Sequence, residues 1–289
     1  MTGGVTVVIA TRDRRAELIR TLRHLHELTP APPVVVVDNG STDDTAYAVR
    51  TDFSDVTVLA LRRNYGAPAR NLGVLAARTP YVAFSDDDSW WARGALQQAA
   101  QVLDAHPRLG LVAARTLVGP TQRPDPLTQV LATSPLPRPS HSPGPSALGF
   151  LACSAVLRRS AFLEVGGFNK LLFFVGEEQL LSYDLAAAGW ERTYLQDVVA
   201  HHHPSAHRPD PGRRRVAELR NGLLTAVLRR PLRVAFDSAA ALARDSLHDA
   251  SARRALCGAL VRLPAALRRR APLPETVEQQ ICLLEGRHP

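Results

Sequence analysis

The chain has 289 residues, 45% of them apolar and 6% aromatic, so it is long and apolar enough to bury a sizeable core. Basic residues outnumber acidic ones by 35 to 27, which gives a formal charge of +8, and Lys170 is the only lysine. This composition excludes a collagen-like, coiled-coil or largely disordered chain. The charge favours an anionic substrate or membrane surface, or reflects the arginine bias of a GC-rich genome. The basic residues are not interleaved with aromatics, which argues against nucleic acid as a partner.

Cysteine content and hydropathy predict a cytoplasmic protein. The three cysteines, Cys153, Cys257 and Cys282, are odd in number and lack the spacing of a metal site, which favours a reducing compartment. A strand-like run begins within the first few residues, so we expect no signal peptide. No uncharged apolar run reaches the roughly 20 residues that cross a bilayer. Peripheral contact with the inner face of the membrane is left open.

Apolar runs alternate with amphipathic segments through the first third of the chain. The runs lack polar alternation, which is typical of strands buried on both faces. Repeated strand–helix–strand units predict an open, mostly parallel sheet with helices on both sides, an α/β fold. Predicted strands lie at residues 5–10, 34–37, 56–61 and 81–84, and predicted helices at 11–28, 47–50 and 71–77.

The second half of the chain changes character twice. Residues 119–147 are dense in proline and poor in apolar periodicity, so we expect a flexible loop, either a substrate-side flap or an inert insertion. From about residue 216 the sequence predicts helices alone, broken at Pro231, Pro264 and 272–274. We therefore divide the chain into a catalytic domain, 1–210, and a helical C-terminal extension, 211–289. Other predicted elements are helices at 91–106, 160–164 and 177–188 and strands at 109–114, 150–157 and 193–195.

Three consecutive carboxylates, Asp86, Asp87 and Asp88, come directly after a predicted strand. In open parallel sheets ligands bind at the carboxyl ends of strands, and Thr11 and Asp38 also follow strands, so these side chains should converge on one edge. Carboxylate oxygens suit Mg²⁺ or Mn²⁺, which are commonly held by one or two carboxylates together with substrate phosphates. A helix N-terminus with acidic residues facing its dipole is the alternative, and it accounts for only one or two of the three.

Five motifs, in order and in register over residues 4–205, resemble those of the family 2 glycosyltransferases. They are VVIATRDR, VVVVDNGSTDDT, the run from RNYG to SDDDSWW, GGFN, and FFVGEEQLL followed by HHHPS. The resemblance implies a GT-A fold, a Rossmann-like and mostly parallel sheet flanked by helices. It also implies an inverting, metal-dependent hexosyltransferase that takes sugar from a nucleoside-diphosphate sugar, with UDP- and dTDP-sugars favoured.

Positions within these motifs imply roles for individual residues. Asp86 and Asp88 would be the outer members of the family's Asp-x-Asp element and bind Mn²⁺ or Mg²⁺ together with the sugar-nucleotide diphosphate. The nucleotide itself would be contacted by Thr11, Asp38, Arg70, Asp86 and Asp87.

The run His201-His202-His203 is a second candidate for the metal site. In many relatives a histidine beyond the acidic helix completes the metal shell, and His201 fits that position best, with His203 as second choice. Mixed carboxylate and imidazole ligands would favour Mn²⁺ over Ca²⁺. The histidines could instead end a strand in solvent or contact a phosphate.

An inverting transfer needs a base to deprotonate the acceptor hydroxyl, and the family places a carboxylate at a helix start. Here the segment reads Gly-Glu-Glu-Gln-Leu, residues 176–180, so that Glu178 aligns with the catalytic Asp while Leu180 replaces a later Asp. Neighbouring carboxylates raise one pKa of the pair toward useful basicity. Glu177 is the alternative base, and both could simply complement a helix dipole.

Several features leave two explanations open. Trp90 and Trp91 could stack on a sugar ring or anchor the core. The basic amphipathic segment 213–230 could lie on an anionic membrane, pack on the protein's own core or join a second subunit as a homodimer. The acceptor could be a glycan, a lipid-linked sugar or a small molecule. Two alternative functions are a sugar-phosphate nucleotidyltransferase and a non-catalytic nucleotide-sugar-binding subunit. The segment ATRDRRAE after the first strand lacks the glycines expected of a nucleotidyltransferase, which argues against the first.

Overall fold

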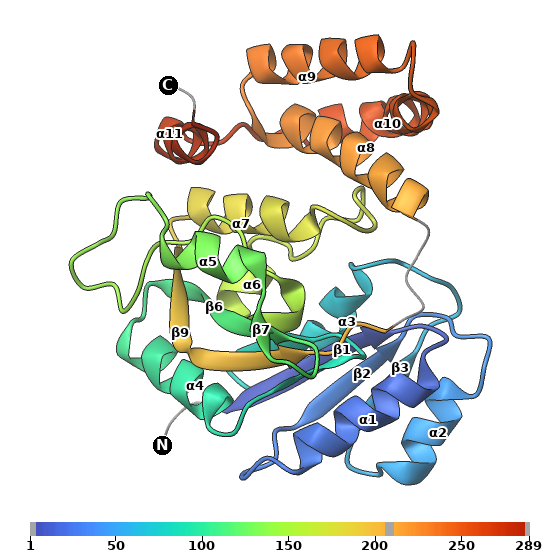
Figure 1. Ribbon diagram of the computed structural model, residues 1–289, viewed down its shortest axis with the longest axis vertical. Coiled ribbons are helices and arrows are strands. Elements are labelled where there is room, and N and C mark those ends of the chain that lie inside the picture. Colours follow the sequence, from blue (N-terminus) through green and yellow to red (C-terminus); the bar gives the residue numbers. More distant parts are fainter. Residues whose placement is uncertain (1–3, 206–210, 287–289) are drawn as a thin grey trace.

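A mixed nine-stranded sheet forms the centre of the computed structural model, which describes residues 4–205 and 211–286 (Figure 1). The strands are β1 Val5–Thr11, β2 Val34–Asp38, β3 Thr57–Ala60, β4 Tyr81–Ser85, β5 Ser89–Trp91, β6 Leu109–Val118, β7 Arg123–Pro124, β8 Ala155–Arg158 and β9 Glu191–His202. The helices are α1 Arg15–His26, α2 Thr45–Asp52, α3 Ala69–Ala76, α4 Ala95–Ala105, α5 Pro126–Ala132, α6 Arg159–Glu164, α7 Glu177–Ala187, α8 Pro211–Arg229, α9 Leu232–Asp245, α10 Ala250–Arg268 and α11 Glu275–Leu284.

The sheet order is β3-β2-β1-β4-β8-β6-β9-β5, with β7 paired to β6. Strands β1 to β4 run parallel, as the sequence predicts, whereas β8 is antiparallel to both of its neighbours. In the register of the parallel strands Thr11 lies opposite Asp38, and Ile9 lies opposite Ser85. The carboxyl ends of β1, β2 and β4 therefore meet at one edge of the sheet.

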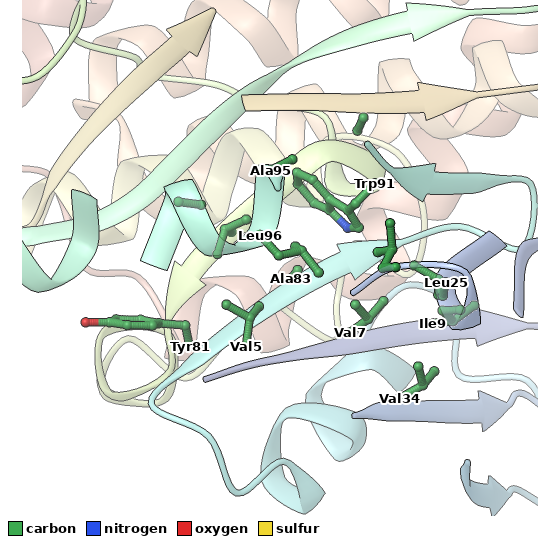
Figure 2. Close-up of a cluster of buried hydrophobic side chains, with 14 of the residues drawn as sticks. Val5, Val7, Ile9, Leu25, Val34, Tyr81, Ala83, Trp91, Ala95 and Leu96 are labelled. Carbon is green, nitrogen blue, oxygen red and sulfur yellow. The ribbon is translucent and has the colours of Figure 1, made fainter. Parts of the chain in front are cut away.

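Both faces of the parallel strands are covered by apolar side chains. Val5, Val7 and Ile9 point to one face, where they pack with Leu25 of α1 and Trp91 (Figure 2). The intervening Val8 belongs to the cluster on the other face, with residues of α3 and α6. A fully buried side chain of this size contributes about 1.5–3 kcal/mol, so the uninterrupted valine runs stabilise strands with helices on both sides.

The helix expected at 91–106 is shorter in the structure, because β5 occupies its first residues. Gly94, at φ +78°, forms the left-handed residue before α4 and separates the two elements. Trp91 is 1% exposed and anchors the core, whereas the Trp90 ring stacks on His24 with centroids 4.1 Å apart. The core explanation therefore holds for Trp91.

The proline-rich segment 119–147 is not the unstructured loop that its composition suggested. It contains β7 and α5, and the Asp125 side chain caps α5 by accepting a 2.9 Å hydrogen bond from the Leu127 N–H. Pro126 lies in the first turn, where its missing N–H costs no hydrogen bond. Leu131 and Leu136 are buried, so the segment is packed against the rest of the molecule.

Two other strands differ from the sequence expectation. Of the predicted strand at 150–157, only residues 155–157 pair in the sheet, where they form β8 together with Arg158 after a 3₁₀ turn at Ala152–Ser154. Conversely, the short strand expected near 193–195 is β9, twelve residues long, which pairs with both β6 and β5.

Helices α8 to α11 lie together beyond α7, at the end of the molecule away from α1 and α2 (Figure 1). Leu223 and Val227 of α8 are buried in a cluster that also contains Leu172 and Leu180. The apolar stripe of segment 213–230 thus packs within the protein. Pro264 does not end a helix, because α10 continues through it. Within the ranges described, no helix has the length and hydropathy to cross a membrane.

Candidate active site

Polar side chains meet where the parallel strands end. Thr11 closes β1 and Asp38 closes β2, and both are buried. Asp38 Oδ1 accepts a 2.9 Å hydrogen bond from the Ser41 N–H, which fixes the turn after β2. Asp86 begins the turn after β4. The expected convergence of these three residues is confirmed. Their contacts with a nucleotide stay predictions.

The three consecutive aspartates point in different directions. Asp87 is buried against α1, and its Oδ2 accepts a 3.0 Å hydrogen bond from Thr11 Oγ1. Burial, opposed by the nearby Arg14 guanidinium, raises the pKa of Asp87 to about 7. Asp86 and Asp88 belong to a separate group beyond the strand end. Thr11 and Asp87, two of the residues predicted to contact the nucleotide, therefore contact each other in this structure.

Two arginines neutralise the acidic run. Arg14 lies between two carboxylates, with Nε 3.0 Å from Asp87 Oδ1 and a terminal nitrogen donating to Asp88 Oδ2 at 2.8 Å. Arg70 of α3 donates to Asp86 Oδ1. The Arg70 side chain is 11% exposed, and its Nε has no hydrogen-bond partner among the described residues. Burial alone would lower the pKa of Arg70, but Asp86, Glu177 and Glu178 outweigh it and raise that pKa.

The histidine that reaches the carboxylates is His202. Its Nε2 lies 3.3 Å from Asp88 Oδ1, and this contact raises the pKa of His202 against the lowering effect of burial. The same contact lowers the pKa of Asp88, against the raising effect of burial. His201 instead donates through Nδ1 to Gln122 at 2.6 Å, so the structure does not bring it to the predicted position.

The pairing of β5 with β9 explains why His202, and not the neighbouring His201, reaches the carboxylates. Ser89 lies opposite His202, and Trp90 lies opposite His201. Because side chains alternate between the faces of a strand, a shift of one residue moves an imidazole to the other face. The His202 side chain consequently lies on the same face of the sheet as Ser89, the residue that follows Asp88. His203 contributes its backbone N–H to the Asp88 carbonyl at 2.8 Å.

Asp86, Asp88 and His202 form a group that fits a divalent cation. One ligand atom from each lies within 4.8 Å of the others. Two carboxylates with an imidazole are a donor set that suits Mn²⁺ or Mg²⁺ better than a larger oxygen-only ion such as Ca²⁺. The side chains come from the turn after β4 and the end of β9, so the sheet itself sets their spacing.

Glu177 and Glu178 open α7 after Gly176, which has φ +84°. Glu177 is 2% exposed, and its Oε2 has no hydrogen-bond partner among the described residues, whereas Glu178 is half-buried. Burial, together with repulsion from Glu178, raises the pKa of Glu177. Burial likewise raises the pKa of Glu178, with Asp86 adding to the effect and Arg70 opposing it.

Both glutamates line a cavity of about 410 Å³. Its walls are mostly apolar and come from α5, the segment 148–151, the loop before α7, and the C-terminal helices. Among the described residues, Arg214 of α8 is the one cation in the wall. The apolar lining residues include Val130, Leu131, Phe150, Phe174 and Leu284.

The loop before α7 is held from two sides. Asn221 of α8 is buried, and its Nδ2 lies 2.9, 2.8 and 2.6 Å from the carbonyl oxygens of Leu172, Phe174 and Val175. On the other side Gly66, at φ +69°, lies so close to Phe173 that a Cβ would be 2.1 Å from its carbonyl oxygen. The position of the glutamates thus depends on α8 as well as on the sheet.

Three residues at this site were not predicted from the sequence. Arg14 precedes α1 within VVIATRDR, and its charge next to an acidic run was an available signal. His202 required the β5–β9 register. Asn221 lies over 40 residues beyond the loop that it contacts, and no local pattern marks it.

Comparison with known proteins identifies the family. Residues 6–166 match the model for Glycosyl transferase family 2. The chain belongs to this family. It is a glycosyltransferase, which selects one of the functions that the sequence left open.

Two relatives come from Mycobacterium tuberculosis. An N-acetylglucosaminyl-diphospho-decaprenol L-rhamnosyltransferase is 29% identical over 250 residues, covering 73% of this chain and 80% of the relative. A pre-mycofactocin glycosyltransferase is 34% identical over 216 residues, covering 69% of this chain and 43% of the relative.

Solved glycosyltransferase structures share the GT-A fold of this glycosyltransferase. The mannosyltransferase PcManGT from Pyrobaculum calidifontis, in complex with GDP-Man and Mn²⁺, has a TM-score of 0.61 at 21% identity and covers 100% of this chain and 89% of its own. TarS 1–349 from S. aureus in complex with UDP-GlcNAc has a TM-score of 0.60 at 17% identity and covers 96% and 83%. At these identities the likeness concerns the fold alone.

Proposed function

We propose that this glycosyltransferase transfers a sugar, with inversion, from a nucleoside-diphosphate sugar to an acceptor hydroxyl, and that it requires Mn²⁺ or Mg²⁺. The observation that carries the proposal is the group Asp86, Asp88 and His202 at the carboxyl edge of the sheet, with Glu177 and Glu178 close enough to Arg70 to raise the pKa of its guanidinium. UDP- and dTDP-sugars are the favoured donors, since the sequence motifs resemble those of enzymes that use them.

Asp86, Asp88 and His202 would hold the cation. When bound, the ion would supply a Lewis acid that offsets the charge on the departing diphosphate. Arg14 and Arg70 already pair with these carboxylates, which keeps the acidic run folded and in position. The Arg70 guanidinium, with an unpartnered Nε, is also placed to donate to a phosphate oxygen.

Glu178 would take the proton from the acceptor hydroxyl as that oxygen attacks the anomeric carbon. It is the more exposed of the two glutamates, and it lines the cavity in which an acceptor could lie. Its raised pKa makes it a stronger base than an ordinary carboxylate. Glu177 is buried, and its Oε2 has no hydrogen-bond partner among the described residues; burial and the charge of Glu178 raise its pKa to about 8, so it would stay mostly protonated while Glu178 carries the charge.

The acceptor would be a sugar linked through a diphosphate to an apolar chain. The cavity beside the glutamates has mostly apolar walls, and Arg214 supplies one cation for a diphosphate. The name of the decaprenol-linked rhamnosyltransferase relative supports this class of acceptor over a free glycan.

A donor panel tests the proposal. The purified chain would be mixed with UDP-, dTDP- and GDP-sugars and Mn²⁺, and release of the nucleoside diphosphate would be measured with and without acceptor. We expect release to stop with a chelator and to fall at least a hundredfold in Asp88→Ala, and the product to have the opposite anomeric configuration. Turnover that persists in the chelator would overturn the metal requirement, and a retained configuration would overturn the inversion.

A further inference from the structure

The helix α9 carries a row of apolar side chains on its exposed side. Leu232 and Phe236 are 58% and 70% exposed, and Leu247, just beyond the helix, is 70% exposed. With the exposed Ala240 and Ala243 they follow the spacing i, i+4, i+8, i+11 and i+15, which places them along one side of a helix. We call these five residues the outer face of α9. Ala235 and Leu242 are buried on the other side, in the cluster shared with α8 and α10.

The outer face belongs to a basic part of the chain, although α9 itself contains two arginines and two aspartates. Residues 231–270 contain eight arginines and three aspartates, with no lysine or glutamate. Arg233 and Arg244 follow Leu232 and Ala243 by one position and so lie along one edge of the face, with Asp237 between them. In the described part of the chain neither arginine has a carboxylate within 4.0 Å. Their charges are therefore not neutralised within the protein.

We propose that the outer face of α9 docks on an anionic lipid bilayer. A helix that presents leucine and phenylalanine between arginines can place its apolar side among the acyl chains and its guanidiniums among the phosphates. A second copy of the chain fits less well, because symmetric pairing of this face would bring the arginines of both copies together. Helix α9 is the outermost element at its end of the molecule, which leaves it accessible (Figure 1).

The docking would bring the cavity beside Glu177 and Glu178 toward the membrane surface. Arg214 of α8 lines that cavity and α8 packs with α9, so one helix joins the outer face to the cavity wall. The docking rests on the exposed face and its charges. It does not depend on the identity of the proposed acceptor.

Vesicle sedimentation of the full chain tests the proposal. Vesicles of phosphatidylcholine with phosphatidylglycerol would be compared with vesicles of phosphatidylcholine alone. We expect the protein to sediment with the anionic vesicles only, and the bound fraction to fall as salt is raised from 0.05 to about 0.5 M, since the Debye length shortens over that range. Absence from both vesicle types, or equal binding to both, would overturn the proposal.

A matched pair of double variants locates the surface. In α9, Arg233→Glu with Phe236→Asp removes one cation and one apolar contact; in α2, Tyr47→Asp with Arg50→Glu makes the same change of charge at the same spacing. Tyr47 is also 70% exposed, so neither pair disturbs the core. We expect about tenfold weaker vesicle binding, or more, for the α9 pair and little change for the α2 pair.

Donor binding and the thermal midpoint would be measured for both pairs, to show that each variant is folded. An equal loss of vesicle binding in the two pairs would overturn the assignment to α9. So would wild-type protein that dimerises without lipid and an α9 pair that is monomeric, because the face would then join two copies of the chain.

Discussion

Adjacent aspartates repel one another, and at this site each has a different partner that relieves the repulsion. Asp87 turns inward to Thr11, while Arg14 lies between Asp87 and Asp88. Arg70 pairs with Asp86 from another element. With Arg70 beside Asp86 and Arg14 beside Asp88, the repulsion between the outer two carboxylates is offset, so both can stay together at the end of the strand.

The two glutamates of α7 can be separated by isosteric changes. We expect Glu178→Gln to lower kcat by 10²–10⁴-fold, because the amide cannot take a proton from the acceptor. Glu177→Gln should leave most of the activity, because a buried glutamate whose pKa is about 8 is mostly protonated near neutral pH and the amide replaces a neutral group. Transfer rates at saturating donor would measure both. The reverse ranking would make Glu177 the base.

The pH dependence of transfer should follow from the raised pKa of this pair. The base acts deprotonated, and burial raises the pKa values of Glu177 and Glu178 above the usual value for glutamate, roughly 4.3. Activity should therefore increase with pH across a range well above that value, and be lost as pH falls. In Glu177→Gln the acidic limb should stay in place, because burial and the charge of Glu178 raise the pKa of Glu177 to about 8, so that the amide replaces a group that is already neutral over that range. A kcat–pH profile would measure it, and a limb that moves to lower pH would show that Glu177 is charged there.

Neighbouring histidines on β9 offer a direct test of the metal group. His202→Ala should weaken Mn²⁺ binding about tenfold or more, because it removes an imidazole from the group with Asp86 and Asp88. His201→Ala should change it little, since His201 hydrogen-bonds Gln122. Titration of Mn²⁺ followed by its electron paramagnetic resonance signal gives both affinities. Greater loss in the His201 variant would restore the assignment made from sequence.

At the scale of elements, the parallel half of the sheet was predictable and the antiparallel half was not. The strands at 5–10, 34–37 and 81–84 have local valine-rich patterns that agree with their burial on both faces. Strand β9 has no such pattern, because Gln196 and Asp197 interrupt it, and the register between β5 and β9 decides which histidine meets Asp88. The structure therefore brings the predicted carboxylates Asp86 and Asp88 together, but with His202 in place of His201, and their roles as metal ligands stay predictions.

Proline was a misleading signal in two segments. In 119–147 a single proline at the start of α5 favours the helix, although the composition as a whole suggested a loop. In α10 the helix continues through Pro264, where contacts with α8 and α9 outweigh the lost backbone hydrogen bond. Tertiary packing decided both cases, and it cannot be read from local composition.

The contact between α8 and the loop before α7 can be tested by changing two neighbouring residues of α8. Asn221→Ala should lower the free energy of unfolding by about 1–3 kcal/mol and slow transfer, because three carbonyls lose a buried donor and the glutamates lose their support. Gly222→Ala is the matched control: no atom lies within 4 Å of its added Cβ, and alanine favours a helix. Urea unfolding and transfer rates would be measured together. An Asn221→Ala variant with unchanged stability and transfer rate would contradict the role of Asn221 in holding the loop before α7.

Considered as a whole, the C-terminal helices share one core with the catalytic part. Leu172 and Leu180 come from the segment around the loop and α7, yet their cluster consists mainly of α8, α9 and α10 residues. Arg229 of α8 also pairs with Asp184 of α7 at 2.5 Å. The sequence suggested a domain boundary near residue 210. That residues 1–210 and 211–289 are independent domains stays a prediction.

Removal of residues 211–289 tests that boundary. We expect the shortened chain to aggregate or to unfold at a clearly lower temperature, because the truncation exposes Leu172 and Leu180 and removes Asn221. Soluble yield, thermal midpoint and donor hydrolysis would be compared with the full chain. A shortened protein with undiminished stability and donor hydrolysis would show that residues 1–210 fold alone.

The stacking of Trp90 on His24 gives the protein an optical reporter next to the group Asp86, Asp88 and His202. The indole lies two residues after Asp88, with the His203 ring 4.6 Å from its centroid as well. An imidazolium quenches the emission of an indole that it touches. Intrinsic fluorescence should therefore register a proton or a ligand arriving beside β5, without any label attached to the chain.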